Sequence, residues 1–359
     1  MSKKLNILVC PLNWGLGHAT RCVPVISELI ESGHQVTLGG DGPGIILLKN
    51  TFSDLNHIVI PSTEIRYGKG ILFIPTLLSQ MPAFLRNIKT EHRLLNEILK
   101  KQSFDMVISD NRYGLYNEST RNVIITHQLM VKLPRLISFA EALLHDFIDR
   151  RLSYFDHVLV PDNAGTDNFS GDLSHKFQTG KKVIFTGIIS RFTCAQIKEE
   201  TEKKYDVLFI NSGPEPHRTT LENIIISQLK NSGSTAAILR GLPETIDHQT
   251  VDQIDFFTHA NDDDFLKLVA QSRYIIARGG YSTIMDFVAL NRKAVLIPTP
   301  GQTEQEYLAK HLHKNGMFVF ERQKAFSLKN ALEKLSLLNG THKITGKTLL
   351  KETLERIIA

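Results

Sequence analysis

Short apolar segments alternate with longer amphipathic segments along most of the chain. Short apolar runs are typical of strands buried in a parallel sheet, and apolar positions spaced three and four residues apart are typical of helices packed on one face. A first series of strands is expected at 6–10, 35–39, 57–60, 106–109, 123–126, 157–160 and 183–186, and a second at 206–210, 236–239, 255–258, 274–277 and 294–297. Helices are expected between most neighbours, including 25–32, 83–101, 221–231, 263–271 and 284–290.

This alternation predicts an α/β fold with two Rossmann-like parallel-sheet domains. We expect an N-terminal domain at 1–190, a C-terminal domain at 191–340, and a final helix within 341–359 that packs back on the first domain. The boundary is expected near 188–204, where a strand ends and a charged stretch precedes a fresh strand. That stretch also fits a solvated helix face. Two such domains facing a cleft would place ligands at the carboxyl ends of both sheets.

Composition indicates a globular protein. The chain has 359 residues, 42% apolar and 22% charged, which is more than one ordinary domain needs. No apolar run reaches the length of about eighteen residues that a membrane-spanning helix requires. The short apolar start leads into a glycine loop, which favours a buried strand over a signal peptide and so a cytoplasmic location.

Cysteine content and charge exclude several classes of protein. Cys10, Cys22 and Cys194 are widely spaced and odd in number, which fits reduced thiols and not a disulfide framework or a zinc site. The net charge of +5 is mild. Even segment 66–151, with 13 Lys and Arg against 8 Asp and Glu, is too dilute in charge for a nucleic-acid interface. No nucleic-acid partner is therefore expected.

The same segment is compatible with attraction to a membrane surface. Residues 70–78 are apolar, and Arg86, Lys89 and Arg93 follow them. One interpretation is that this region contacts the cytosolic face of an anionic membrane, as a peripheral protein does, and receives a lipid-linked acceptor. The alternative is a buried core element with one face in water.

A glycine loop follows the first expected strand and contains Gly15, Gly17 and His18. Glycine lets the backbone adopt positive φ and pass close to a ligand. Pro24 is expected within the first turn of the next helix, which places His18 in the loop or at the helix start, at the carboxyl edge of the sheet. Free N–H groups at that helix start attract an anion. The alternative is a tight turn with a packed histidine.

Two further loops carry similar features. Ser212 and Gly213 follow the strand at 206–210 and suit a phosphate, with the cationic Arg218 and His217 close by; the alternative is a proline-stiffened turn. The strand at 274–277 runs into segment 278–286, where two glycines, then hydroxyl residues, then a helix form a good diphosphate cradle.

The polar residues of segment 278–286 have two interpretations. Asp286 can hold ribose hydroxyls, or it can form a capping box with Thr283. After the last expected strand and turn, Glu304 and Gln305 open another helix and would point into the same crevice. Taken alone, these two are ordinary residues for a helix start.

These four segments, in this order, resemble those of GT-B glycosyltransferases. The family-28 type is most similar, and its best-known member adds N-acetylglucosamine to the peptidoglycan lipid intermediate. The resemblance spans most of the chain. Residues 15–18 match the family's glycine–histidine loop, 278–286 resembles its Arg-Ser-Gly-Ala-x-Thr-x-x-Glu segment, and 297–309 resembles its Val-Pro-x-Pro…Gln…Asn-Ala stretch. Residues 126–128 resemble its His-Glu-Gln acceptor-side loop.

The resemblance implies a UDP-sugar donor, held mainly by the C-terminal domain as a co-substrate, with no cofactor and no metal. Asp286 then lies at the ribose, Thr283 and the backbone at Gly280 at the diphosphate, and Gln305 near the sugar. The other donor-side candidates are Gly15, Gly17, Ser212, Gly213, Arg218, Arg278, Gly279, Ser282 and Glu304, and those of the acceptor side are Arg21, His127 and Gln128.

This sequence departs from the family's pattern at three positions. Asp286 replaces a longer Glu, Leu308 replaces an Asn, and Glu304 stands where His is frequent. The departures bear on the donor sugar more than on the nucleotide.

The expected reaction is inverting transfer of the sugar to a lipid-linked or glycan acceptor. His18 is the first candidate for the base that deprotonates the acceptor, since an imidazole titrates near neutral pH. Asp110, at the end of the strand at 106–109, is the second candidate, or it orients His18, or it is a strand-end turn residue. Helix N-termini at Thr283 and Ser212, with Arg218 or Arg278, can stabilise the leaving diphosphate without metal.

Three alternatives remain open. The spacing of Gly15, Gly17, His18 and Arg21 also resembles that of a relative that hydrolyses a UDP-sugar in pseudaminic acid synthesis. Sugar-nucleotide epimerases share the fold, and a non-catalytic sugar-nucleotide-binding protein belongs to another class. The three aspartates at 262–264 are interpreted as the polar start of a helix, and the alternative for them is a metal-binding cluster.

Overall fold

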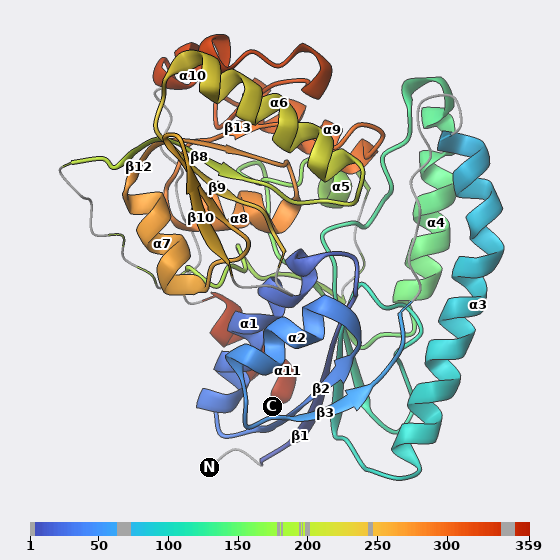
Figure 1. Cartoon of the computed structure of the whole chain (residues 1–359). Helices are drawn as coiled ribbons and strands as arrows, with labels where there is room; N and C mark the ends of the chain where they lie inside the picture. Colours follow the sequence, from blue (N-terminus) through green and yellow to red (C-terminus); the bar gives the residue numbers. More distant parts are fainter. Residues whose placement is uncertain are drawn as a thin grey trace. The chain divides into compact units, whose positions relative to one another are not determined.

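The chain divides into two compact units, as a computed structural model shows (Figure 1). The structure describes residues 4–62, 73–177, 180, 182–193, 195, 197, 202–242, 247–338 and 349–359. The first unit combines residues 1–193 with 344–359, and the second comprises 194–343. Each unit is built on one seven-stranded sheet, so the predicted α/β class with two Rossmann-like domains is confirmed.

The sheet of the first unit is parallel and has the strand order β3-β2-β1-β4-β5-β6-β7. All seven predicted strands are present. Their bounds are β1 Asn6–Pro11, β2 Gln35–Gly40, β3 Asn56–Val59, β4 Met106–Asp110, β5 Arg121–Ile125, β6 His157–Val160 and β7 Val183–Phe185.

Alternate residues of these strands face two helical layers, because successive side chains of a strand point to opposite faces. Ile7, Val9 and Ile108 belong to a core shared with α1 (Leu16–Glu31), α2 (Gly42–Thr51) and α11 (Leu349–Ile358). Leu8 and Val107 face the other way, toward α3 (Phe73–Leu99). The helix α4 (Glu141–Leu152) covers the neighbouring strands on the same side as α3 (Figure 1).

The helix α11 follows the second unit in sequence but packs in the first. Leu354 and Ile357 are buried in the core with α1. Nζ of Lys351 lies 3.3 Å from Oε1 of Glu28 on α1, and the guanidinium of Arg121 donates a hydrogen bond to the carbonyl oxygen of Ile357. The first unit is thus completed by residues that are distant in sequence.

The second sheet has the order β10-β11-β9-β8-β12-β13-β14, and its strands are parallel except for β10, which pairs with β11 in the antiparallel sense. Its strands are β8 Tyr205–Ile210, β9 Ala236–Leu239, β10 His248–Val251, β11 Ile254–Phe257, β12 Ser272–Ala277, β13 Val295–Leu296 and β14 Val319–Phe320.

Helices cover both faces of this sheet as well. Val207, Phe209 and Ile276 form a core with α6 (His217–Ser232) and α10 (Leu328–Ser336). Figure 1 shows α7 (Asp262–Ala270) and α8 (Tyr281–Ala289) on the opposite side. The remaining elements are α9 Thr303–Lys314, the short α5 Asp172–His175, and the 3-10 turns η2 Arg135–Ala140 and η3 Gln323–Ala325.

The expected position of Pro24 is wrong. We expected it in the first turn of its helix, but α1 begins at Leu16 and encloses Pro24 in its interior. An interior proline costs about 3 kcal/mol because it lacks an N–H and clashes with the preceding turn. Burial of Cys22, Val25, Ile26 and Leu29 on the inner face of α1 offsets that cost.

Candidate functional site

Both sheets have a topological switch point, where the strand order reverses direction. It lies between β1 and β4 in the first unit and between β8 and β12 in the second. Ligands of open α/β sheets bind outside the carboxyl ends of the strands at such points. His18 follows β1 and Asp110 ends β4, whereas Ser212 follows β8 and Gly279 follows β12. The candidate residues therefore gather at two switch points, one in each unit.

Helix α1 positions His18 by starting abruptly after β1. Gly15 is the N-cap of α1 and has φ +82°, a conformation that residues with a side chain rarely adopt. The hydroxyl of Thr20 donates to the carbonyl oxygen of Gly17 at 3.0 Å within the first turn. The tight start places His18 in the first turn of α1, beside the carboxyl end of β4.

A network of four side chains occupies this switch point. Nδ1 of His18 lies 2.8 Å from Oδ1 of Asp110. Nε of Arg21 donates to Oδ2 of Asp110 at 2.8 Å, and Nη2 of Arg21 donates to Oδ1. Nη1 of Arg21 lies 3.1 Å from Nδ1 of His127, and Nη2 lies 3.1 Å from Nδ1 of His18. Arg21 thus joins both histidines to one carboxylate.

Asp110 is ionised in this network. Burial alone would raise the pKa of its carboxyl group, but the charges and hydrogen bonds of Arg21 and His18 outweigh burial and hold that pKa well below its usual value. Two groups face Nδ1 of His18, and we assign a proton to this nitrogen because the carboxylate of Asp110, at 2.8 Å, lies nearer than Nη2 of Arg21, at 3.1 Å. The tautomer leaves Nε2 as a proton acceptor, which is the arrangement of a general base.

The acceptor-side candidates differ in their surroundings. Arg21 is only 2% exposed and its guanidinium is bidentate on Asp110, so the structure places it behind His18 as a partner of the carboxylate. His127 is also buried. The backbone N–H of Gln128 donates to Oγ1 of Thr126 at 3.1 Å, and Gln128 itself is half-buried.

At the second switch point, α8 starts directly after two glycines. Gly280 is the N-cap of α8, and no side chain caps the helix, so Thr283 and Asp286 do not form a capping box. A Cβ atom on Gly280 would meet no atom closer than 3.9 Å, and one on Gly279 none closer than 3.5 Å. Packing within the protein therefore does not require either glycine, and the helix start is left open to a ligand.

Three buried polar atoms at this edge have no hydrogen-bond partner among the described residues: Oδ1 of Asn211, Nε of Arg278 and Oγ1 of Thr299. Each residue follows the carboxyl end of its strand, β8, β12 or β13, and these strands are neighbours in the sheet. Buried polar atoms are nearly always paired, so unpaired ones call for an explanation such as a missing ligand. We did not predict Asn211 and Thr299 as site residues, although each is the first polar residue after a predicted strand.

The two arginines predicted for the diphosphate are held by the protein. The guanidinium of Arg218 is paired with Glu215 and lies 3.4 Å from Oε2 of Glu222. Arg278 is 1% exposed, and its Nη atoms donate to the side chain of Gln323 at 2.8 Å and to the main chain at His217, Ile297 and Pro298. Burial lowers the pKa of Arg278 to about 10. The observed pairing holds both guanidinium groups in place, while Nε of Arg278 stays unpaired within the described residues.

The other donor-side candidates lie in the loop after β8 and at the helices α8 and α9. The hydroxyls of Ser212 and Thr283 have no hydrogen-bond partner in the described part of the chain, and both residues are half-buried. Gly213 has φ +97°, which favours glycine. Oε1 of Gln305 accepts a hydrogen bond from the backbone N–H of Thr299 at 2.8 Å. This bond sets the orientation of the Gln305 amide, whose nitrogen is a donor. Ser282 and Glu304 are half-buried at their helix starts, and Asp286 lies buried further along α8.

The aspartates at 262–264 begin a helix, as predicted. They form the first turn of α7, where Oδ1 of Asn261 caps the backbone N–H of Asp264 at 2.9 Å. Within the described residues, no group of three His, Cys, Asp or Glu side chains is arranged to hold a metal ion. Cys10 and Cys22 are free and buried, and burial raises the pKa of Cys10 to about 12. Cys194 lies outside the described residues.

Comparisons with known proteins agree with this geometry. Residues 225–354 match the glycosyltransferase family 28 C-terminal domain. A protein of Methanosarcina acetivorans, named an uncharacterized glycosyltransferase, is 24% identical over 330 residues, which cover 87% of this chain and 82% of that protein.

Two solved structures resemble the whole chain. The glycotransferase of kitacinnamycin matches with a TM-score of 0.66 and 14% identity, over 99% of this chain and 100% of that one. Acinetobacter baumannii MurG matches with a TM-score of 0.58 and 13% identity, over 99% of both chains. These likenesses establish the fold, and the sequence matches establish the class of activity. The chain is a glycosyltransferase of the GT-B fold, and its residues 225–354 are similar to the family-28 C-terminal domain.

Proposed function

We propose that the protein transfers a sugar from a UDP-sugar to a hydroxyl of a lipid-linked or glycan acceptor, with inversion and without metal. The observation that carries the donor site is the set of unpaired polar atoms on Asn211, Arg278 and Thr299 at the second switch point. A diphosphate and its ribose supply both donors and acceptors for such atoms. The open start of α8 adds backbone N–H groups and a partial positive charge for the phosphates.

The proposed chemical step needs a base and a stabilised leaving group. Nε2 of His18 takes the proton of the acceptor hydroxyl while the oxygen forms a bond to the anomeric carbon. The bond from that carbon to the diphosphate breaks, and UDP leaves with the electron pair. Asp110 stabilises the imidazolium that forms. The N-terminus of α8, with the hydroxyl of Thr283, stabilises the charge on the departing diphosphate.

The nucleotide preference gives a first prediction, with Asp286 as the proposed ribose contact. UDP should raise the melting temperature more than GDP or TDP does. Asp286→Ala should weaken UDP binding by about 1–3 kcal/mol, the usual cost of removing a hydrogen bond to a charged group. Asp263→Ala, which removes an exposed carboxylate of the same unit, is the matched control and should bind normally. Calorimetric titration gives the affinities, and equal UDP affinity in wild type and Asp286→Ala removes Asp286 from the site.

Peripheral membrane association is also proposed. Of the expected membrane segment 70–78, residues 70–72 lie outside the described part, as do the side chains of 73–78. The described residues add a second apolar feature: Phe139 is 80% exposed and Leu143 is 70% exposed, four positions apart on η2 and α4. No described helix is apolar over a length that would span a bilayer. An exposed apolar pair beside a basic segment fits surface insertion.

We therefore predict that the double variant Phe139→Ser/Leu143→Ser loses most of the binding to anionic liposomes in a flotation assay at low salt. Its melting temperature should stay unchanged, because neither side chain packs in a core. Undiminished flotation of this variant would exclude Phe139 and Leu143 as the contact, and failure of the wild-type protein to float would remove the membrane from the proposal.

A further inference from the structure

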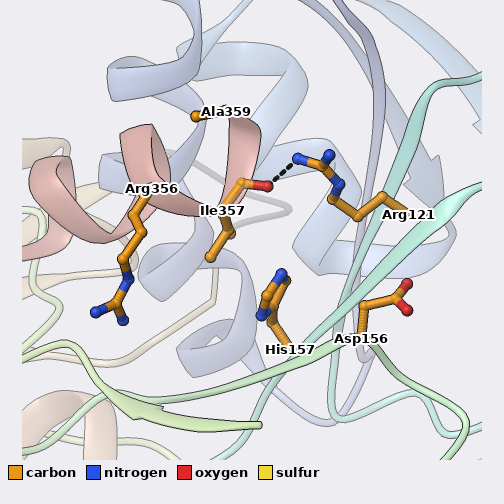
Figure 2. A pocket seen from close by; sticks show the side chains of 6 residues that line it. All are labelled: Arg121, Asp156, His157, Arg356, Ile357 and Ala359. Carbon is orange, nitrogen blue, oxygen red and sulfur yellow. Dashed lines mark hydrogen bonds between the residues drawn. The ribbon is translucent and has the colours of Figure 1, made fainter.

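A basic hollow lies at the other edge of the first sheet, where β5 and β6 begin (Figure 2). Its volume is about 520 Å³. Arg121 is the first residue of β5, His157 is the first of β6, and Arg356 lies on the last turn of α11. Asp156, Ile357 and Ala359 complete the lining. The network around His18 lies at the carboxyl ends of the strands, so the hollow is a separate feature.

Cations dominate this hollow. Figure 2 shows the guanidinium groups of Arg121 and Arg356 on two sides of the ring of His157. Neither group forms an ion pair within the part of the chain that the structure describes. Lys182 is a third cation nearby, and its Nζ donates only to the carbonyl oxygens of Ser153 and Phe155, at 3.0 Å each.

The carboxylates nearby neutralise these cations only in part. Oδ2 of Asp156 accepts from the backbone N–H of Asn122 at 2.7 Å and lies 3.4 Å from its side-chain nitrogen. In Figure 2 the carboxylate of Asp156 points away from Arg356. Ala359 forms no ion pair with any described side chain. Arg121, Arg356 and Lys182 thus carry three positive charges around the hollow against two negative charges, those of Asp156 and the terminal carboxylate of Ala359, which leaves one positive charge in excess.

The pKa of His157 reflects the charges around the hollow. Burial contributes most to lowering the pKa of its ring, and Asp156 opposes the shift. Arg121, Arg356 and Lys182 then lower the pKa further by charge repulsion. Three cations thus act on one imidazole against a single carboxylate.

We propose that this hollow binds a phosphate-type anion, held by Arg121 and Arg356 with His157 between them. Guanidinium groups present planar forks of N–H donors that match phosphate oxygens. Arg121 uses one Nη to hold Ile357 and retains Nε and its other Nη for the anion.

The position of the hollow gives the anion a structural effect. Two of its proposed ligands, Arg121 and His157, belong to the sheet, whereas Arg356 belongs to α11. An anion bound to all three ties α11 to the first sheet. Any local opening of α11 must then release the anion, so binding slows that opening.

Amide hydrogen exchange of residues 349–358 tests this proposal, with inorganic phosphate and glycerol 3-phosphate as probes. At a probe concentration about ten times its dissociation constant, exchange in α11 should slow about tenfold. Arg356→Gln should abolish the effect, and Arg121→Lys, which keeps the charge but loses the fork, should reduce it. Arg150→Gln, an exposed arginine of α4, should behave as wild type. Because the readout is confined to α11, phosphate bound at the donor site does not contribute to it.

A second arm identifies the source of the phosphate. The anion is a lipid headgroup if the protein floats with phosphatidate vesicles, if Arg356→Gln abolishes this flotation, and if glycerol 3-phosphate does not slow the exchange of α11. Protection by glycerol 3-phosphate without Arg356-dependent flotation assigns it to a soluble phosphomonoester. The proposal is overturned if neither probe changes the exchange of α11 and Arg356→Gln does not reduce flotation. Equal protection in wild type and Arg356→Gln also overturns it.

Discussion

His18→Ala should reduce sugar transfer by about 10²–10⁴, the usual contribution of a positioned general base. The reason is the geometry around Nδ1, where Asp110 at 2.8 Å fixes the tautomer that leaves Nε2 free to accept a proton. UDP binding should remain near the wild-type value, since the proposed nucleotide contacts belong to the second unit. The loss should therefore fall on kcat and not on UDP affinity. The matched control is His248→Gln, an exposed histidine of β10, which should keep full activity.

The measurement is UDP release with and without a crude lipid or glycan extract. A transferase releases UDP slowly alone, because an occupied site excludes water, and faster with the acceptor. Release that no extract accelerates, matched mole for mole by free sugar, would identify a UDP-sugar hydrolase. If release depends on the extract but His18→Ala keeps the full rate, the base must be sought at Asp110.

Arg21→Met should destabilise the first unit by about 3–5 kcal/mol at pH 7, the cost of leaving a buried charge without its partner. Asp110 is fully buried and receives two hydrogen bonds from Arg21. Denaturant unfolding measures the change. The double variant Arg21→Met/Asp110→Asn should recover much of the loss, because it removes the unpaired charge as well. A single variant within about 0.5 kcal/mol of wild type, the range of an ordinary surface substitution, would show that Asp110 does not depend on Arg21.

The pH dependence of this loss has a defined sign. In the wild type the pKa of Asp110 is depressed below its unfolded value of about 3.9, so its contribution to stability is present above that pH and is lost as the pH falls toward the folded pKa. Without Arg21, burial acts on the carboxyl group with less opposition and raises its pKa, so protonation relieves the buried charge. The difference in unfolding free energy between wild type and Arg21→Met should therefore shrink as the pH is lowered from 7 to 4.

Most strands could be predicted because they are buried on both faces and read as apolar runs. The exceptions have physical causes. β10 is exposed at all four residues and pairs only at the edge of the sheet, so it carries no apolar run. β14 is two residues long. Helix α2 begins with Gly42 and Pro43, which are typical of a turn, and it is held by packing against α1.

The site could be predicted only in part, because a loop motif gives positions along the chain and not contacts. The glycine loop indicated His18. This residue is 92 positions from Asp110 in sequence, and the pairing of β1 with β4 brings the two together. Nothing in the sequence indicates that Arg21 faces Asp110, because α1 was expected to start nine residues later than it does. The charges of Arg218 and Arg278 suggested phosphate contacts, but Glu222 and the carbonyls that bind them are brought close only by folding.

The late position of α11 in the sequence affects how the protein is made. A ribosome synthesises residues 349–358 only after the whole of the second unit, yet Leu354 and Ile357 fill the core under α1. Domains generally fold in the order in which they are synthesised. The first unit is synthesised first, but its apolar surface on α1 stays uncovered until α11 has been made. A stop codon just before α11 would leave that surface uncovered permanently, so such truncated chains should be targets for chaperones and proteases even though every strand of both sheets is intact.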